Sequence, residues 1–291
     1  MSAFILIFII ATAALQNIVR KEYIRKEYVK GGSRGTVFLF NAVASLCAAI
    51  FLLFASIGSL ELSWKFIPYS LAYAVASLCV YLFSVFALAT GPLSLTSFFT
   101  SYSLLLPTLY GIVFLGEKIT VTMIIALVLF FISAALTNIE KRGEPKKITA
   151  KWLTFVLLAL LGTGFSSIIQ KAEQIKFNGS YKNEFMMIAF IIIAAIMLFL
   201  SLIFEKGSIM QNFKRTVAMA SLVGAASGII NLLIMILTGL MAASLMFPVI
   251  SAGGIVAAFL VSLIVYKEKL SPCQYAGAAL GTVAVILFNI G

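Results

Sequence analysis

The chain has 291 residues, of which 62% are hydrophobic and 11% charged, and its mean hydropathy is +1.12. A soluble domain carries far more charge and cannot bury so much apolar surface, so the composition excludes a water-soluble globular protein. Histidine and aspartate are both missing from the sequence. Most metal, hydrolytic and phosphoryl-transfer sites use one of them, and there is no glycine-rich phosphate loop. We therefore predict no metal, no cofactor and no enzyme activity.

Hydrophobic segments follow one another along the whole chain, and a helix needs roughly 20 apolar residues to cross the hydrocarbon of a bilayer. The sequence predicts ten such spans: 2–19, 36–57, 66–88, 93–116, 120–138, 152–170, 185–204, 216–238, 243–266 and 271–290. The net charge of +11 comes from basic residues beside these spans. We therefore predict the lipid bilayer, and not nucleic acid, as the partner of this charge.

Two uncharged stretches of 51 residues each, 66–116 and 216–266, contain two spans apiece. As a single helix, each would run about 75 Å, more than twice the ~30 Å hydrocarbon core. Each stretch must therefore fold back once. The predicted breaks are at Gly91-Pro92 in the first stretch and at Gly239 in the second.

The second half of the sequence repeats the first at an offset of 151 residues. The segment 117–120 (Glu-Lys-Ile-Thr) corresponds to 268–271 (Glu-Lys-Leu-Ser), and hydrophobic runs follow both. Five spans per half reverse the direction of the second copy. The predicted fold is therefore an all-α integral membrane protein, with ten transmembrane helices arranged as a 5+5 inverted repeat. Its repeats, 1–145 and 146–291, form one membrane domain.

The charged loops predict the orientation. Loops after the first, third, fifth, seventh and ninth spans contain 16 of the 21 lysines and arginines, which leaves five on the other side. The positive-inside rule places the larger group in the cytoplasm and both termini outside.

Polar and aromatic side chains within the spans are the candidate substrate-binding residues, because a polar group that faces lipid is costly and is expected to point inward. Inward hydroxyls also hold helices together, so helix packing is an equally good interpretation. The candidates are Gln16, Asn17, Lys21, Tyr73, Tyr81, Ser97, Phe98, Thr100, Ser101, Tyr102, Ser166, Ser167, Gln170, Lys171, Asn231 and Ser251. Ser227 is a further polar residue in span 216–238.

Lys21 and Lys171 end the first predicted helix of their respective halves. One interpretation is a lysine that extends its ammonium to the membrane surface. The other is the electropositive rim of a central cavity, which would favour substrates with a carboxylate or a phosphate. No titratable side chain lies in the middle of any predicted span, so the sequence indicates no residue that couples transport to an ion.

Glu117 and Glu268 lie at helix junctions and precede Thr120 and Ser271 by three residues. We expect each hydroxyl to cap the helix that follows, and each carboxylate to bind the free amides at the same helix start. We therefore interpret both glutamates as structural.

Glycines spaced four residues apart recur in the second half, at Gly224 and Gly228 and again at Gly277 and Gly281. This spacing is typical of helices that pack closely against a neighbour.

The two halves resemble the ten-helix members of the drug/metabolite transporter superfamily, the EamA-type permeases. The repeat of that family has a Gly-Glu pair, a Lys/Arg-aliphatic-Ser/Thr step and a helix with spaced glycines. Here the first half has 116–120, and the second has 268–271 with Gln274, Gly277 and Gly281. The resemblance implies a basket of helices with a central cavity lined by the first, third, fourth, sixth, eighth and ninth spans. It also implies cytoplasmic termini, opposite to the charge count. We retain the orientation from the charge count because 16 basic residues against five is a large difference.

These observations predict a secondary transporter that moves a small organic metabolite, an amino acid or a related amphipathic solute, by alternating access. The alternative is a flippase or transporter of a lipid-linked or phosphate-bearing substrate on the same fold. The predicted location is the cell membrane (the inner or plasma membrane) of a bacterium, with multiple passes. The predicted partners are the small-molecule substrate and the lipid bilayer, with the chain as a monomer or a homodimer.

Overall fold

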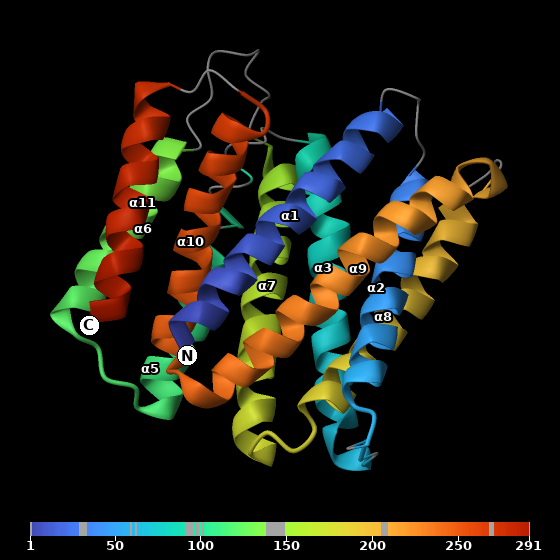
Figure 1. The fold of residues 1–291 in the computed structure, drawn as a ribbon, viewed down its shortest axis with the longest axis horizontal. Coiled ribbons are helices and arrows are strands. Elements are labelled where there is room, and N and C mark those ends of the chain that lie inside the picture. The colour runs from blue at the N-terminus through green and yellow to red at the C-terminus, as the bar shows by residue number, and fades with distance from the viewer. Residues whose placement is uncertain are drawn as a thin grey trace. The chain divides into compact units, whose positions relative to one another are not determined.

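The computed structural model describes residues 2–28, 34–58, 60, 61, 63–90, 96, 99, 100, 102–137, 149–204, 209–267 and 271–290. This part of the chain contains ten α-helices, two short 3₁₀ helices and no strand (Figure 1). The α-helices are α1 (Ser2–Tyr28), α2 (Arg34–Ala55), α3 (Ile67–Thr90), α5 (Leu105–Leu115), α6 (Val121–Thr137), α7 (Ala150–Phe177), α8 (Lys182–Phe204), α9 (Ile209–Leu240), α10 (Ala243–Ile264) and α11 (Pro272–Ile290). The 3₁₀ helices are η1 (Trp64–Phe66) and η2 (Tyr102–Leu104).

The structure confirms the prediction of an all-helical fold with apolar helices that can cross a membrane. Seven helical segments are long and apolar enough to cross a bilayer: Ser2–Arg20, Gly35–Ala55, Trp64–Ser84, Ala150–Phe177, Lys182–Phe204, Thr216–Leu240 and Ala243–Val261. Three shorter apolar segments are Tyr102–Leu115, Val121–Thr137 and Pro272–Phe288. The chain is therefore a multi-pass membrane protein. The predicted break near Gly239 is confirmed, because α9 ends at Leu240 and α10 begins at Ala243; Gly91 and Pro92 lie outside the described residues.

Helix α7 continues beyond its predicted span, which ended at Gln170. Lysine, glutamate, glutamine and alanine are good helix formers, so the charged segment after Gln170 extends the helix although it ends the hydrophobic run. The helix stops where Asn178 and Gly179 adopt left-handed φ angles of 51° and 79°. The amide of Gly179 donates to the carbonyl of Gln174 at 3.2 Å, which closes the C-terminal turn. Helix α1 likewise runs past its predicted end to Tyr28.

The chain divides into two compact units, and each draws on both halves of the sequence. Unit 1 comprises Met1–Ile10, Val75–Ala172 and Leu240–Gly291, and unit 2 comprises Ala11–Ala74 and Glu173–Gly239. The repeats predicted from the sequence and the compact units are therefore different divisions of the chain.

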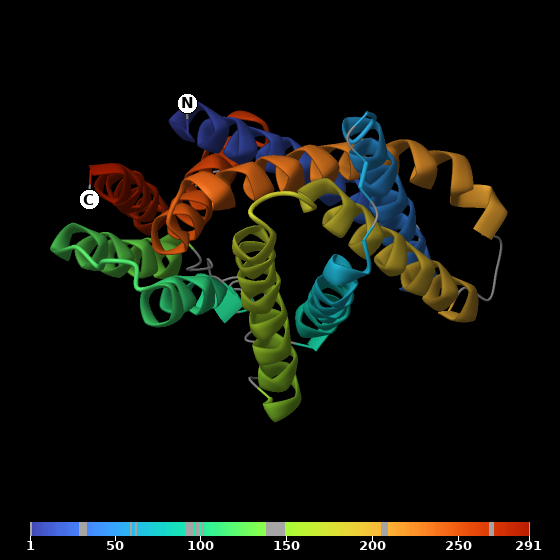
Figure 2. The same cartoon turned by 90° about the horizontal axis from the view of Figure 1, so that it is seen from below.

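In unit 1, α6 and α11 lie side by side and run in opposite directions (Figures 1 and 2). The Ser133 hydroxyl donates to the carbonyl of Gly277 at 2.7 Å, and the Gln274 side-chain amide donates to the carbonyl of Thr137 at 3.5 Å. Gly281 also faces Ser133. The helix-packing interpretation of Gly277 and Gly281 is confirmed, since both lie against α6.

In unit 2, α2 and α8 form the corresponding antiparallel pair (Figure 1). The Ser201 hydroxyl, near the end of α8, donates at 2.9 Å to the carbonyl of Gly35, at the start of α2. The rings of Phe38 and Phe204 meet edge to face at a centroid distance of 5.6 Å. Helix α9 contributes Gly224 and Gly228 to the same unit, where they lie against Ala44, Cys47 and Phe51 of α2, so the packing interpretation holds there as well.

The helices in each pair are equivalent under the sequence offset. Adding 151 to the bounds of α6 (121–137) gives 272–288, and α11 is Pro272–Ile290. Adding 151 to the bounds of α2 (34–55) gives 185–206, and α8 is Lys182–Phe204. Repeat-equivalent helices thus pack against each other in both units, in antiparallel orientation.

Because α6 and α11 approach each other closely at Gly277, one added methyl group at this position should lower the stability of the protein strongly. A Cβ on Gly277 would lie 2.8 Å from Thr137 Cγ2 and 2.9 Å from the Thr137 backbone nitrogen, whereas a Cβ on Gly254 of α10 would meet no atom within 4 Å. We expect Gly277→Ala to lower the free energy of unfolding by about 1–3 kcal/mol through overpacking. Gly254→Ala is the matched control and should cause no loss. Thermal unfolding in detergent measures both, and equal melting temperatures would contradict this account of the pair.

Candidate functional site

Unit 2 contains a chain of hydrogen bonds made by polar side chains of three apolar helices to one another and to backbone carbonyls. Gln16 on α1 donates to the Ser227 hydroxyl and to the Val223 carbonyl at 3.3 Å, both on α9. The Asn231 side-chain amide donates to the Ser227 carbonyl at 2.9 Å. Tyr73 on α3 donates its hydroxyl proton to Asn231 Oδ1 at 3.2 Å. We call Gln16, Ser227, Asn231 and Tyr73 the polar network.

The polar network combines three of the candidates predicted from the sequence, and its fourth member, Ser227, was recognised only as a polar residue of its span. The Tyr73 ring is held by edge contacts with Phe185 and Phe190 of α8, at centroid distances of 5.7 and 6.5 Å. Tyr73 is buried, while Gln16, Ser227 and Asn231 are half-buried. The network has donors and acceptors but no ionisable acid or strong base, so it is chemically suited to hydrogen-bonding a neutral or zwitterionic solute.

Unit 1 contains a charged cluster at the start of α10. The Glu117 carboxylate accepts from the backbone amides of Ala243 and Ser244, each at 2.8 Å. The Lys171 ammonium donates to the carbonyl of Met241 at 2.8 Å and interacts electrostatically with Glu117. A carboxylate and a lysine thus bind the chain on either side of the helix start. The geometry fits a structural role for Lys171 better than a lysine that extends to the membrane surface, because this side chain is only 7% exposed.

The prediction that the Glu117 carboxylate binds the start of α6 is wrong, although the structure supports a structural role for this residue. Its carboxylate binds the start of α10 and not that of α6. Thr120 alone caps α6, through a bond from the Met123 amide at 3.2 Å. At α11, Ser271 and Gln274 bond reciprocally, at 3.3 and 2.9 Å, and form a capping box. Glu268 lies outside the described residues.

An aromatic cluster in unit 1 surrounds Tyr102. Its ring stacks on Phe131 with a centroid distance of 4.5 Å and an interplanar angle of 18°, and Phe99 lies 6.4 Å away. Phe99 meets the Trp152 ring edge to face at 5.8 Å, and the indole nitrogen of Trp152 donates to the Thr96 hydroxyl at 3.0 Å. Tyr102 therefore takes part in helix packing, with the tryptophan donor satisfied by a threonine.

The remaining candidates are not members of the polar network, and some of them lie outside the described part. Ser166, Ser167 and Thr100 donate to carbonyls of their own helical segments. The side chain of Asn17 is exposed, those of Tyr81 and Ser251 are half-buried, and that of Gln170 is buried. Ser97, Phe98, Ser101 and the side chain of Lys21 lie outside the described residues.

Sequence reasoning missed one group of chemical interest, Glu173 on α7. Its side chain is fully buried, three residues beyond the predicted end of the span. The continuous run of helix-forming residues after Gln170 could have predicted a longer helix, and this extension of α7 contains the buried Glu173.

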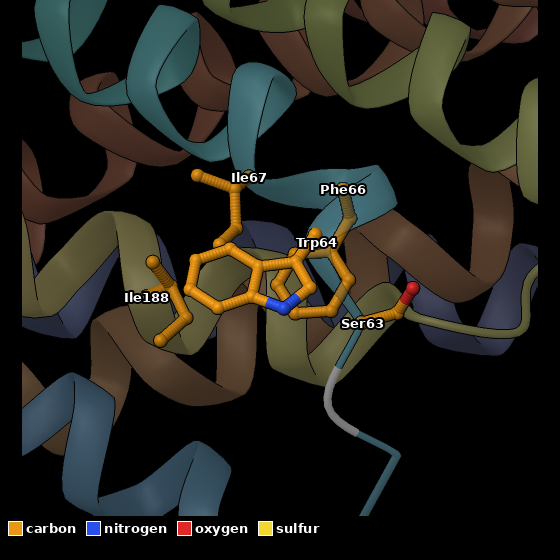
Figure 3. Close-up of a pocket in the computed structure, with 5 residues that line it drawn as sticks. All are labelled: Ser63, Trp64, Phe66, Ile67 and Ile188. Atoms are coloured by element: carbon orange, nitrogen blue, oxygen red, sulfur yellow. The ribbon is translucent and has the colours of Figure 1, made fainter.

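A small apolar hollow of about 240 Å³ lies in unit 2 at the start of α3 (Figure 3). It is lined by Ser63, Trp64, Phe66, Ile67 and Ile188. Ile67 and Ile188 project toward the Trp64 ring (Figure 3). None of the candidate residues lines it, and its apolar walls offer few hydrogen bonds to a polar solute.

No protein-family model matches the chain, and no curated protein matches its sequence. A solved structure titled only "Crystal structure of protein" is similar, with a TM-score of 0.76 and 15% sequence identity, over 99% of this chain and 95% of that chain. At this identity the similarity shows the fold alone. A solved protein therefore shares the fold over nearly its whole length.

The contacts of Glu117 predict a loss of stability when its charge is removed. A glutamine has one acceptor oxygen and cannot satisfy both amides at the start of α10. We expect Glu117→Gln to lower the free energy of unfolding by about 1–3 kcal/mol. Glu61→Gln, at an exposed glutamate, is the control and should change it by less than about 0.5 kcal/mol. A Glu117→Gln protein that melts like the wild type would contradict this role.

Proposed function

We propose that the protein is a secondary transporter of the drug/metabolite transporter superfamily, of the EamA type, located in the cell membrane. It moves a small organic metabolite, such as an amino acid or a related amphipathic solute, by alternating access. The ten helices form two five-helix repeats of opposite orientation.

The antiparallel packing of repeat-equivalent helices supports the inverted repeat. A two-fold axis in the membrane plane turns each helix of the first repeat into an oppositely directed partner in the second. Pairs close to such an axis touch each other, as α6 touches α11 and α2 touches α8. A repeat of parallel copies would not produce antiparallel equivalents.

The polar network is the single observation that carries the proposed transport function. Gln16 and Asn231 are half-buried and bond across helices, Gln16 to Ser227 and Asn231 to Tyr73, in a unit that is otherwise rich in apolar side chains. Amide and hydroxyl groups that form hydrogen bonds with one another can form them with a solute instead. This favours a neutral or zwitterionic metabolite over a phosphate-bearing lipid, since no cation belongs to the network.

Substitution of Asn231 tests this role. We expect Asn231→Ala to weaken ligand binding by roughly 5–150-fold, because the solute and Tyr73 would lose a shared partner worth about 1–3 kcal/mol. A thermal-shift screen of free amino acids against purified protein measures binding, since a bound ligand raises the melting temperature. Uptake of the best ligand into proteoliposomes then measures transport.

Asn41→Ala is the matched control, because Asn41 belongs to the same unit and its side-chain amide donates to the Val37 carbonyl of its own helix at 3.1 Å. The Asn41→Ala protein should show the same ligand-induced rise in melting temperature and the same solute uptake as the wild type. Equal binding and uptake by the Asn231→Ala, Asn41→Ala and wild-type proteins would remove the polar network from the transport function.

A further inference from the structure

Glu173 is a buried carboxyl group for which the described residues provide no hydrogen-bond donor. It lies on α7 in unit 2, its side chain is 0% exposed, and neither Oε1 nor Oε2 has a hydrogen-bond partner. A buried charged group without a partner is among the most unfavourable arrangements in a protein, so it is retained only where something offsets it. The Glu173 side chain forms no hydrogen bond that would explain why it is buried at this position.

A second carboxylate makes the surroundings of Glu173 more negative. Glu184, in the first turn of α8, is buried as well, and its charge acts on Glu173. Glu184 is itself well accommodated: it accepts from the Glu61 backbone amide at 3.2 Å and lies at the positive end of the α8 dipole. Of the two carboxyl groups, Glu173 is therefore the one that needs a positive partner.

The other unpartnered atoms near these two residues in sequence are also acceptors. Gln174 Oε1 and Asn183 Oδ1 are buried without a donor in the part of the chain described. The other titratable groups along the adjoining segments of α7, α8, η1 and α3 are Lys171, Lys176, Lys182, Glu61, Lys65, Tyr69 and Tyr181. None of them donates a hydrogen bond to Glu173, and α9 has no ionisable side chain between Thr216 and Gly239. Four lysines occur in these segments, but none of them bonds to Glu173, and the unpartnered atoms close to it in sequence are oxygen acceptors. A carboxyl group in this setting suits a proton or a small hard cation with oxygen ligands.

We propose that Glu173 is the carboxylate that binds the coupling cation of the transporter, a proton or a sodium ion, with Glu184 as the neighbouring anion that strengthens its attraction. The coupling role rests on the proposed transport function, whereas cation binding does not. Loading and release of one cation at Glu173 would link the gradient of that cation to movement of the solute, in a chain whose predicted spans have no central titratable group.

Cation binding is measured on the purified full-length protein without any solute. Thermal unfolding is followed between about pH 5 and pH 8 at fixed ionic strength, and again at one pH with sodium chloride replacing choline chloride. If the ligand is a proton, the wild type loses stability as the pH rises, with up to about a tenfold change in the unfolding equilibrium constant per pH unit from one group. If it is sodium, the melting temperature rises with sodium concentration.

Glu173→Gln has nearly the same shape without the charge, and we expect it to lose the dependence on the effective cation. Glu61→Gln removes an exposed acid from the same unit and should behave like the wild type. If Glu173→Gln does not fold, Glu184→Gln serves in its place, and it should weaken the dependence because it removes the supporting negative charge. A Glu173→Gln protein, or in its place a Glu184→Gln protein, with the wild-type response to both cations would overturn the proposal.

The transport assay separates this inference from the proposed function. In proteoliposomes, a gradient of the effective cation should drive uptake by the wild type and not by Glu173→Gln, while solute exchange without a gradient persists in both. Loss of cation binding in Glu173→Gln together with no transport by the wild type would leave the cation site in place and refute the transporter. Uptake by Glu173→Gln that is still driven by the gradient would overturn the coupling role.

Discussion

Helices in a bilayer gain little by hiding apolar side chains from their surroundings, since the lipid is as apolar as leucine. Their association depends instead on close packing of small residues and on polar groups that find partners within the protein. The pair α6 and α11 satisfies both conditions, because Gly277 admits the backbone of α6 and the Ser133 hydroxyl binds the carbonyl of that same glycine. In unit 2, Gly224 and Gly228 bring α9 against α2 in the same way. The arrangement of the chain follows from this requirement, which places small residues at the contacts and leaves 67% of Phe54, for example, exposed to the lipid.

The need of polar groups for hydrogen-bond partners within the protein also explains the contacts of the polar side chains in the spans. Many hydroxyls, such as those of Thr163 and Thr282, bond back to their own helices. Glu117 satisfies the free amides of α10 with a charged acceptor. The polar network differs because its bonds join α1, α3 and α9 while three of its side chains stay half-buried. Interhelical hydrogen bonds in membranes contribute only about 0.6–2 kcal/mol each. A network of this kind therefore adds limited stability, which supports the proposal that it binds a solute.

Hydrophobic runs in the sequence correctly predicted most of the described helices and the break between α9 and α10, because lipid imposes a similar apolar length on every span. The predicted span 93–116 differs, since the described chain there has η2 (Tyr102–Leu104) followed by the short α5 (Leu105–Leu115). The 151-residue offset also paired the helices that pack together. The sequence could not indicate the ends of α1 and α7, since charge ends a hydropathy signal without ending a helix, and Glu173 was missed for this reason. The partner of Glu117 is separated from it by more than a hundred residues, so local capping rules assigned it to the wrong helix. Gln16, Tyr73 and Asn231 were among the candidates, but only the folded chain shows that they form one hydrogen-bonded group. Tyr102 and Ser166 gave the same polar signal, but the Tyr102 ring packs against other aromatic rings and the Ser166 hydroxyl bonds to its own helix.

The most direct test of the central claim is the access of water to the polar network. Cys47, Cys79 and Cys273 are first replaced by alanine, and single cysteines are then introduced by Ser227→Cys, by Phe54→Cys on the lipid-facing side of α2 and by Glu61→Cys in the exposed segment before η1. Labelling with a small, charged, water-soluble thiol reagent in intact membranes is compared at the three sites. The account predicts labelling after Ser227→Cys and Glu61→Cys but not after Phe54→Cys, and slower labelling after Ser227→Cys when a transported solute is present. Labelling after Glu61→Cys alone, with the Ser227→Cys protein as inert as the Phe54→Cys protein, would contradict the account.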